Sequence, residues 1–549
     1  MHKGIRIFAF FFIAVWLLFR HTAGAGFVTD HIGWLYQYEA QGAAGLLRAF
    51  DDKSFHFVYH LAGFLLWKLA GFNGEMWMLV FAALHAAVAS LGMLVFSQFL
   101  KNENVPRAQS IAFFGSLLFL IIPYVTEVLV WYACIHYLLC SFLLLMSFYS
   151  MQQYLQRQGK YYLAAFYSTF FVAVFTLEIS FSFPMIVAAY VLFAKNSNQR
   201  MKTLVLLVAP LLVMLAIYLG LNQYLHGSAI GHYGASTHLN FSLDLLIGNL
   251  CKYGAKLFVY TQFLDYDNRH KLYLFAEKTE VVYGVLVVLL LLVSLFVIRI
   301  KNLPATFRSA GLLFFFFVVA LLPVLNLYFS YLVNIEGDRL SYFASLFSTQ
   351  LVALVAYTIF RSLAFVPLLG LLFVQKPLLE KNISAWEQSG AVHQSLIAGY
   401  RWKDAPRVFV LQLPDNFSGA YMYRDDVQGN VLYTELLLRK MVKPAQCVTQ
   451  IIAYNMEHNT DSINVEKISE SEIKISFAQY GNWWWQKGVG ASSFSTDEYE
   501  VRIGEWNECF IKFRNHYPGA VYIYQSGTQW REIKNFNNAA APPVDGKCG

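Results

Sequence analysis

Carboxylates at the ends of apolar segments are the residues of this sequence best placed to do chemistry. Asp30 follows the first apolar segment in GFVTDHIGW, Glu127 lies in IIPYVTEVLVW, and Glu178 lies in FTLEISFSFP. Further along the chain, NIEGDRLSYF adds Asp338 and Arg339. A carboxylate at bilayer depth is costly, so each of these acids invites a functional interpretation.

Each acid also has a purely structural interpretation. Glu127 and Glu178 could cap helices or pair with a nearby Arg or His. Asp30 could be the N-cap of a helix that begins at His31. Arg339 could serve only as the structural partner of a neighbouring acid. These alternatives stay open at the level of sequence.

The composition of the chain indicates the class of protein to which these acids belong. The 549 residues are 57% hydrophobic and only 14% charged, with a mean hydropathy of +0.45, whereas a soluble protein carries about 25% charged residues. These values exclude a disordered chain, a collagen, a coiled coil and a small disulfide scaffold. A polytopic α-helical membrane protein remains.

The charge distribution predicts two domains. The last 174 residues, from Lys376, carry 18 basic and 19 acidic residues, and the first 375 carry 23 and 15. The basic excess therefore lies in the apolar part, where it is typical of loops that orient helices and not of a nucleic-acid surface. We expect a transmembrane module over 1–376 and a soluble extracytoplasmic domain over 377–549.

Apolar segments of about 20 residues predict about eleven transmembrane helices. The stretches 54–72 and 241–262 carry His or Lys, and we expect them to lie in the membrane interface. Short basic loops alternate with longer mixed ones, so a cytoplasmic N-terminus and an odd number of spans place the tail outside. The expected spans lie near 5–22, 74–100, 109–125, 128–150, 161–177, 179–195, 203–223, 279–299, 309–328, 341–360 and 362–376.

The tail has the patterns of a small α/β or α+β domain. Residues 379–402 and 431–442 have helical patterns. The range 407–426 is expected to form a strand followed by a loop, and further strands are expected in 447–455, 465–469, 472–477, 499–513 and 520–530. Its three cysteines, Cys447, Cys509 and Cys548, allow one disulfide and one remaining thiol.

Several short motifs, in order, resemble a known family. They are Asp30 in the first outer loop; an amphipathic segment followed by a span with His85; Pro123, Glu127 and Trp131 in one run; Glu178 before Pro184; and Leu322-Pro323-Val324-Leu325-Asn326 followed by Asp338, Arg339 and Tyr342. The chain resembles the integral-membrane glycosyltransferases of the GT-C superfamily. It is most similar to the protein O-mannosyltransferase-like branch, which includes the mannosyltransferases with TPR repeats.

The resemblance implies an inverting transfer of sugar from a polyprenyl-phosphate donor to an acceptor hydroxyl on the extracytoplasmic face. Asp30 would then be the catalytic base and Arg339 the partner of the leaving phosphate. Lys256 and Arg269 would lie beside the outer headgroups as further phosphate ligands. Substrate-binding roles would also fall to Glu127, Glu178, Asp338 and Tyr342. No nucleotide motif is present, and a divalent metal is possible although no spacing demands one.

Two other functions remain open. A transporter or flippase of lipid-linked sugar would place its polar groups at mid-membrane and often shows inverted repeats, neither of which is visible. A catalytically inactive relative, serving as an assembly or binding subunit, fits a first loop in which Asp30 is followed by His31 and not by a second acid. Expected partners are the lipid-linked donor, an outer acceptor (protein, glycan or lipid) and membrane lipids, in a bacterial inner membrane with the tail in the periplasm.

Overall fold

The computed structural model describes residues 2–47, 55–193, 200–231, 242–299, 303–327, 329, 335–424, 430–477, 484–485, 493–504, 507–515, 517–533 and 536. The chain forms two compact units. The first comprises residues 1–21 and 43–382, and the second comprises residues 22–42 and 383–549.

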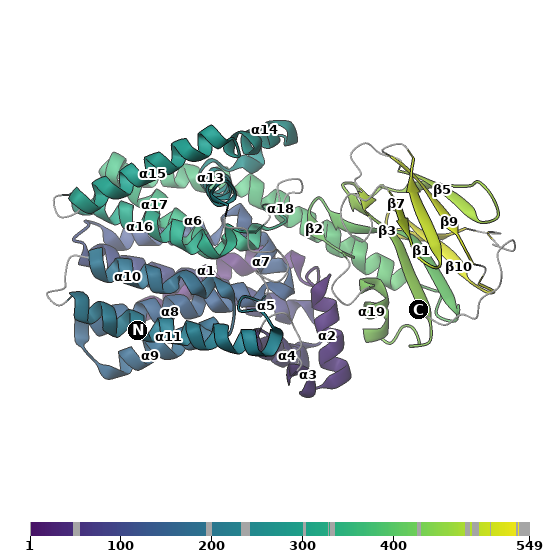
Figure 1. Cartoon of the computed structure of the whole chain (residues 1–549), viewed down its shortest axis with the longest axis horizontal. Helices are drawn as coiled ribbons and strands as arrows, with labels where there is room; N and C mark the ends of the chain where they lie inside the picture. Colours follow the sequence, from purple (N-terminus) through teal and green to yellow (C-terminus); the bar gives the residue numbers. More distant parts are fainter. Residues whose placement is uncertain are drawn as a thin grey trace. The chain divides into compact units, whose positions relative to one another are not determined.

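The first unit is a bundle of helices that pack side by side (Figure 1). Short 3-10 turns interrupt it at Pro123–Val125, Tyr132–Cys134, Glu178–Ser182, Leu322–Val324 and Asp338–Ser341. Its helices are α1 (His2–Phe19), α3 (Ala44–Leu47), α4 (Phe57–Ala70), α5 (Gly74–Asn102), α6 (Ala108–Leu120), α7 (Thr126–Val130), α8 (Ile135–Arg157), α9 (Lys160–Val174), α10 (Phe183–Phe193), α11 (Arg200–His226), α13 (Leu243–Val259), α14 (Tyr266–Ala276), α15 (Thr279–Arg299), α16 (Ala305–Leu321), α17 (Tyr342–Phe360) and the first part of α18 (Phe365–Gly399).

Each expected span overlaps at least one helix, but several expected spans are broken by turns, and the expected count of eleven is not confirmed. In the described part of the chain, six helices are long and apolar enough to cross a bilayer, or seven if the bent pair Ala108–Leu120 and Pro123–Val130 is one span. That pair bends by 58°, because Pro123 lacks the amide hydrogen needed to continue α6. Apolar composition therefore identifies an integral membrane protein, whereas helix length depends on breaks that apolar periodicity does not show.

A buried ion pair ties two distant parts of the bundle together. Arg308 on α16 donates from Nε to Glu103 Oε2 at 2.5 Å, and the Glu103 side chain is fully buried just beyond the end of α5. The pair joins the two loops that the charge pattern assigns to one membrane face. Burying both charges is tolerable because each has its partner.

The second unit is rich in strands. Its first sheet has the order β11-β10-β1-β3-β6, with β2 beside β1, and its second has the order β4-β5-β9-β8-β7. Its strands are β1 (Arg407–Phe417), β2 (Ala420–Tyr421), β3 (Cys447–Met456), β4 (Ile463–Lys467), β5 (Glu472–Phe477), β6 (Trp484–Trp485), β7 (Ser493–Ser495), β8 (Tyr499–Ile503), β9 (Glu508–Phe513), β10 (Val521–Ser526) and β11 (Gln529–Glu532).

The two sheets face each other through aromatic rings. The Phe409 ring on β1 lies 5.2 Å from that of Phe513 on β9, and Tyr522 on β10 lies 4.9 Å from Phe513, between ring centroids. Strand β1 is parallel to both β3 and β10 and is buried along its whole length, as expected for a strand covered on both faces.

In the described part of the second unit, the helices are α2 (Asp30–Gln41), α19 (Val431–Leu438) and the second part of α18. The helices expected in 362–376 and 379–402 form one continuous helix, with Pro377 inside it. In this unit Cys447 is disulfide-bonded, and Cys509 is a buried free thiol.

Candidate functional site

Glu127 and Arg339 come together from positions 212 residues apart. Glu127 lies on α7, just after the Pro123 break, and its side chain is fully buried. Its Oε2 accepts from the Arg339 backbone N–H at 2.6 Å, and its Oε1 accepts from the Gly337 N–H at 3.3 Å and from the Arg339 guanidinium. The guanidinium also lies over the Trp131 ring, 5.0 Å from its centroid. Glu127 therefore pairs with an arginine, which is one of the two structural interpretations given above for this residue.

Asp338 and Lys256 form a second buried ion pair beside the first. The Lys256 ammonium lies 5.1 Å from the Tyr124 ring centroid and 5.6 Å from that of Phe329. The Tyr124 hydroxyl donates to the Lys256 carbonyl at 2.6 Å. The Lys256 ammonium is thus held by a carboxylate and two aromatic faces, and the Lys256 backbone carbonyl is held by the Tyr124 hydroxyl.

Two further basic residues lie on the same side of the bundle. Lys252, one turn before Lys256 on α13, pairs with Glu277. Arg269 on α14 is buried, and this burial lowers its pKa, while Tyr273, Tyr266, Tyr124 and Asp338 favour its charged form. With Arg339, four basic side chains belong to this group. Basic side chains suit an anionic ligand.

Asn249, also on α13, secures the chain that follows α16. Its Nδ2 donates to the Leu325 carbonyl at 2.8 Å and to the Leu327 carbonyl at 2.9 Å. The helix does not continue past this point, so the two carbonyls lack helical N–H partners, and in an apolar surrounding they need donors.

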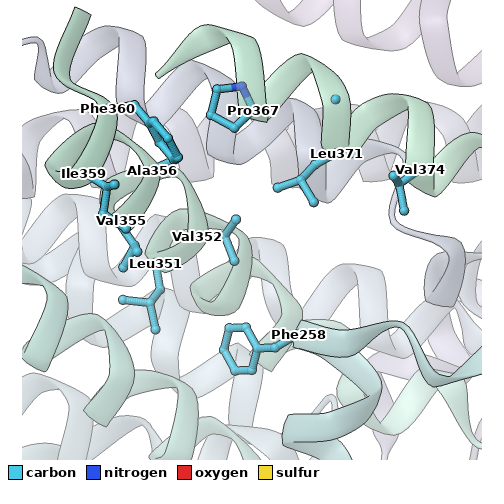
Figure 2. Close-up of a pocket in the computed structure, with 11 residues that line it drawn as sticks. Phe258, Leu351, Val352, Val355, Ala356, Ile359, Phe360, Pro367, Leu371 and Val374 are labelled. Atoms are coloured by element: carbon cyan, nitrogen blue, oxygen red, sulfur yellow. The ribbon is translucent and has the colours of Figure 1, made fainter. Parts of the chain in front are cut away.

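An apolar cavity of about 570 Å³ lies between α17 and α18, with Phe258 of α13 at one side (Figure 2). Its lining includes Leu351 and Val355 of α17 and Leu371 and Val374 of α18. Every residue that lines it is apolar. It therefore suits a hydrocarbon chain and not a sugar or a phosphate.

Two tyrosines connect this cavity to the charged group. Gln375, next to the lining residue Val374, donates to the Tyr260 hydroxyl at 2.6 Å. The Tyr260 ring stacks on that of Tyr124, with centroids 6.3 Å apart and planes 9° apart. Tyr124 is the ring over which Lys256 lies, so the cavity and the cations share one region of the first unit.

Glu178 and Tyr342 have different partners. Glu178 Oε2 lies 3.0 Å from His56 Nε2, and both side chains are buried. The Tyr342 hydroxyl lies 2.7 Å from His85 Nδ1, and His85 Nε2 lies 3.2 Å from the Leu120 carbonyl at the end of α6. Because Nε2 must donate to that carbonyl, Nδ1 accepts from Tyr342. Tyr342 and His85 thus support the bend after α6.

Asp30 belongs to the second unit, whereas Arg339, Lys256, Glu127 and Asp338 belong to the first. Asp30 is exposed and is the first residue of α2, and the N-cap residue is Thr29. The interpretation of Asp30 as the N-cap is therefore wrong. The expected meeting of Asp30 with Arg339 stays a prediction.

Sequence reasoning missed several members of the charged group. Lys252 is spaced four residues from Lys256, so helical spacing alone could have found it. Phe329 and Tyr124 carry no such signal, because an aromatic residue in an apolar run predicts only core packing. Within the described ranges, no set of three or more His, Cys, Asp or Glu side chains could hold a metal ion.

Comparison with known proteins yields solved structures of low sequence identity. Neither a protein-family model nor a curated protein matches the sequence. Among solved structures, the chain is similar to ArnT from Cupriavidus metallidurans in the apo state, at 14% identity over 81% of this chain and 92% of that one, with a TM-score of 0.33. It is also similar to ArnT from Cupriavidus metallidurans bound to undecaprenyl phosphate, at 12% identity over 92% and 97%, with the same TM-score. At these values the likeness carries no argument about function.

Proposed function

We propose that this protein is an inverting glycosyltransferase that moves a sugar from a polyprenyl-phosphate donor to an acceptor hydroxyl on the extracytoplasmic face. The observation that carries the proposal is an apolar cavity linked through Tyr260 and Tyr124 to the buried Lys256, which belongs to a group with the buried Arg269 and the part-buried Arg339. A hydrocarbon chain attached to a phosphate needs both environments next to each other.

The cations suit a leaving phosphate. When the bond between the anomeric carbon and the phosphate oxygen breaks, negative charge develops on that oxygen and must be stabilised. A guanidinium can donate two parallel hydrogen bonds to a phosphate, and an ammonium adds a point charge. Arg339 and Lys256 supply one of each.

The carboxylates of the first unit hold these cations in place. Glu127 accepts hydrogen bonds from both the backbone and the side chain of Arg339, which fixes the guanidinium before any ligand arrives. Asp338 does the same for Lys256. Such preorganisation lowers the cost of ordering the site around the transition state. Glu127 and Asp338 are therefore assigned as positioning residues.

The acceptor hydroxyl must lose its proton as it attacks, and a carboxylate can take that proton. Asp30 is assigned this role from its place in the sequence. As the acceptor oxygen bonds to the anomeric carbon, its proton passes to Asp30, and the polyprenyl phosphate leaves from the opposite face of the sugar. One displacement inverts the anomeric configuration.

Ligand binding to the full chain in detergent tests the site. Undecaprenyl phosphate should bind, whereas undecaprenol, which lacks the phosphate, and inorganic phosphate, which lacks the chain, should bind at least about tenfold more weakly. A methyl group placed on Gly370, a lining residue, meets no atom within 4 Å, so Gly370→Phe should fill the cavity and weaken binding without unfolding the bundle. Gly284→Phe on α15, equally open, is the matched control. Equal binding of all three ligands would refute the site.

Turnover tests the reaction. With an undecaprenyl-phosphate-linked hexose labelled in the sugar, and an envelope extract as acceptor, Asp30→Asn should lower transfer by about 100- to 10,000-fold while undecaprenyl phosphate still binds. A transporter or an inactive assembly subunit should be little affected by the same change. NMR of the product should show an inverted anomeric configuration, and retention would contradict the mechanism.

The proposal includes a location in a bacterial inner membrane with the second unit in the periplasm. The disulfide at Cys447 supports an oxidising compartment for that unit. A divalent metal stays a possible addition, and the protein O-mannosyltransferase-like branch stays a prediction from the sequence motifs. A membrane-impermeant protease added to intact spheroplasts should remove the second unit, and full protection would place it in the cytoplasm.

A further inference from the structure

The segment that carries Asp30 folds with the C-terminal unit. Residues 22–42 belong to the same compact unit as residues 383–549, although more than 340 residues separate them in the chain. Helix α2 packs against α19 (Figure 1). Ile32 and Leu35 of α2 are fully buried, whereas Asp30 at its first turn is exposed.

Helix α19 is in turn fixed to α18 by a buried charge. Glu435 of α19 is fully buried, and its Oε2 lies 2.7 Å from His393 Nε2 on α18. Its Oε1 accepts from Arg439 Nε at 2.8 Å. The Tyr423 ring lies 4.8 Å from that of His393, between centroids. The order of contact is therefore α18, α19 and then α2.

Helix α18 also touches the segment directly. A methyl group built on Gly390 would lie 2.8 Å from Ala25 Cβ and 3.1 Å from Ala25 Cα. A real Cβ does not approach a neighbour so closely, so Gly390 allows a contact that any other residue would force apart. Ala25 lies five residues before Asp30.

The backbone just before Asp30 is in an unusual conformation. Thr29 has φ 50° and ψ −136°, a region that a β-branched residue rarely adopts. Its side chain is buried, and Oγ1 has no hydrogen-bond partner among the described residues. Such a conformation persists only where the surrounding structure imposes it, and it is often found beside functional groups.

From these contacts we infer that the C-terminal unit is part of the transfer machinery, because α18, α19 and Thr29 together set the position of Asp30. Gly390, Glu435 and Thr29 are positioning residues in this inference. It rests on the proposed role of Asp30 as the base. In this inference the second unit positions the catalytic base, which a domain that only binds the acceptor would not do.

Two identical substitutions on one helix test the inference. Gly390→Ala should displace Ala25, whereas Gly399→Ala, whose new methyl group would meet only Trp530 Cδ1 at 3.5 Å, should not. We expect Gly390→Ala to lower kcat by about 10- to 100-fold, since a displacement near 1 Å is enough to do so. The Kd for undecaprenyl phosphate and the KM for the labelled donor should stay within about twofold, because the cations lie in the first unit. Gly399→Ala should behave as the wild type.

A compensating change tests the geometry itself. Ala25→Gly removes the methyl group nearest to the new one and leaves the 3.1 Å contact with Cα, so Gly390→Ala combined with Ala25→Gly should recover part of the lost kcat. In Thr29→Gly the backbone conformation becomes one that glycine adopts readily, so the melting temperature should not fall while kcat does. Unchanged kcat in Gly390→Ala, or the absence of recovery in the double variant, would overturn the inference. Absence of transfer by the wild type would instead overturn the proposed function, so the two failures are distinct.

Discussion

The ion pair between Lys256 and Asp338 allows structural and functional roles to be separated. Lys256 is 5% exposed and Asp338 is 1% exposed. Removing one partner of such a pair leaves an uncompensated buried charge, which costs about 3–5 kcal/mol. Replacing both partners removes the two charges together and is often close to neutral. Lys256→Met and Asp338→Asn should therefore each lower the melting temperature clearly, and the double variant should recover most of that loss.

The affinity of these variants for undecaprenyl phosphate should not follow their stability. A hydrogen bond to a charged group contributes about 1.5–3 kcal/mol, which corresponds to roughly 10- to 100-fold in Kd. Lys256→Met should raise the Kd for undecaprenyl phosphate by this factor. The double variant should be equally weak although its stability has returned, since the ammonium is absent from both.

Thermal unfolding and ligand titration of the full chain in detergent give both quantities. Lys376→Met is the matched control, because its side chain is 60% exposed and its pair with Glu380 lies at the surface, where such pairs contribute about 0–1 kcal/mol. A double variant that binds like the wild type would refute Lys256 as a phosphate ligand. A double variant as unstable as each single one would refute the coupling of the buried pair.

Three further predictions concern other buried groups. Burial lowers the pKa of His31 to about 3, below its unfolded value near 6.5, so the unfolded chain binds more protons between these values. The free energy of unfolding should be highest above pH 6.5 and lower by about 1 kcal/mol at pH 5.5. Melting temperatures measured over this pH range should depend less on pH in His31→Gln than in the wild type. Arg308→Gln leaves the Glu103 carboxylate buried without its partner and should cost about 3–5 kcal/mol; Arg308→Met with Glu103→Gln should recover it, and equal melting temperatures of the single and double variants would contradict the pair. Burial raises the pKa of the Cys509 thiol to about 12, so a maleimide should label it at pH 8 only after unfolding, and rapid labelling of the folded chain would be the contrary result.

The charged group illustrates how far sequence reasoning reached. The ends of apolar segments indicate Glu127, Asp338 and Arg339, and the segment expected beside the outer headgroups indicates Lys256 and Arg269. Their pairing could not be selected, because a sequence position does not show which of several acids faces a given cation. Glu178 had the same pattern as Glu127, yet its partner is His56.

Helix breaks were the main source of error in the fold. Pro123 and Pro323 end helices inside apolar runs that predict continuous spans, whereas Pro377 lies inside α18. Whether a proline ends a helix depends on what satisfies the freed carbonyls. After α16 the side chain of Asn249 binds the carbonyls of Leu325 and Leu327, which follow the break, and this donor comes from a helix more than 70 residues away.

The sequence by itself determined the membrane character of this protein, the strand-rich tail and the set of ionisable residues from which a site could be built. These follow from composition and local periodicity, which each short segment carries independently. Only the tertiary structure decided that Arg339 is held by Glu127, that an apolar cavity is linked to Lys256 through two tyrosines, and that the segment around Asp30 folds with the C-terminal unit. Such pairings depend on long-range packing, where shape and burial select one partner among many of the same chemical type.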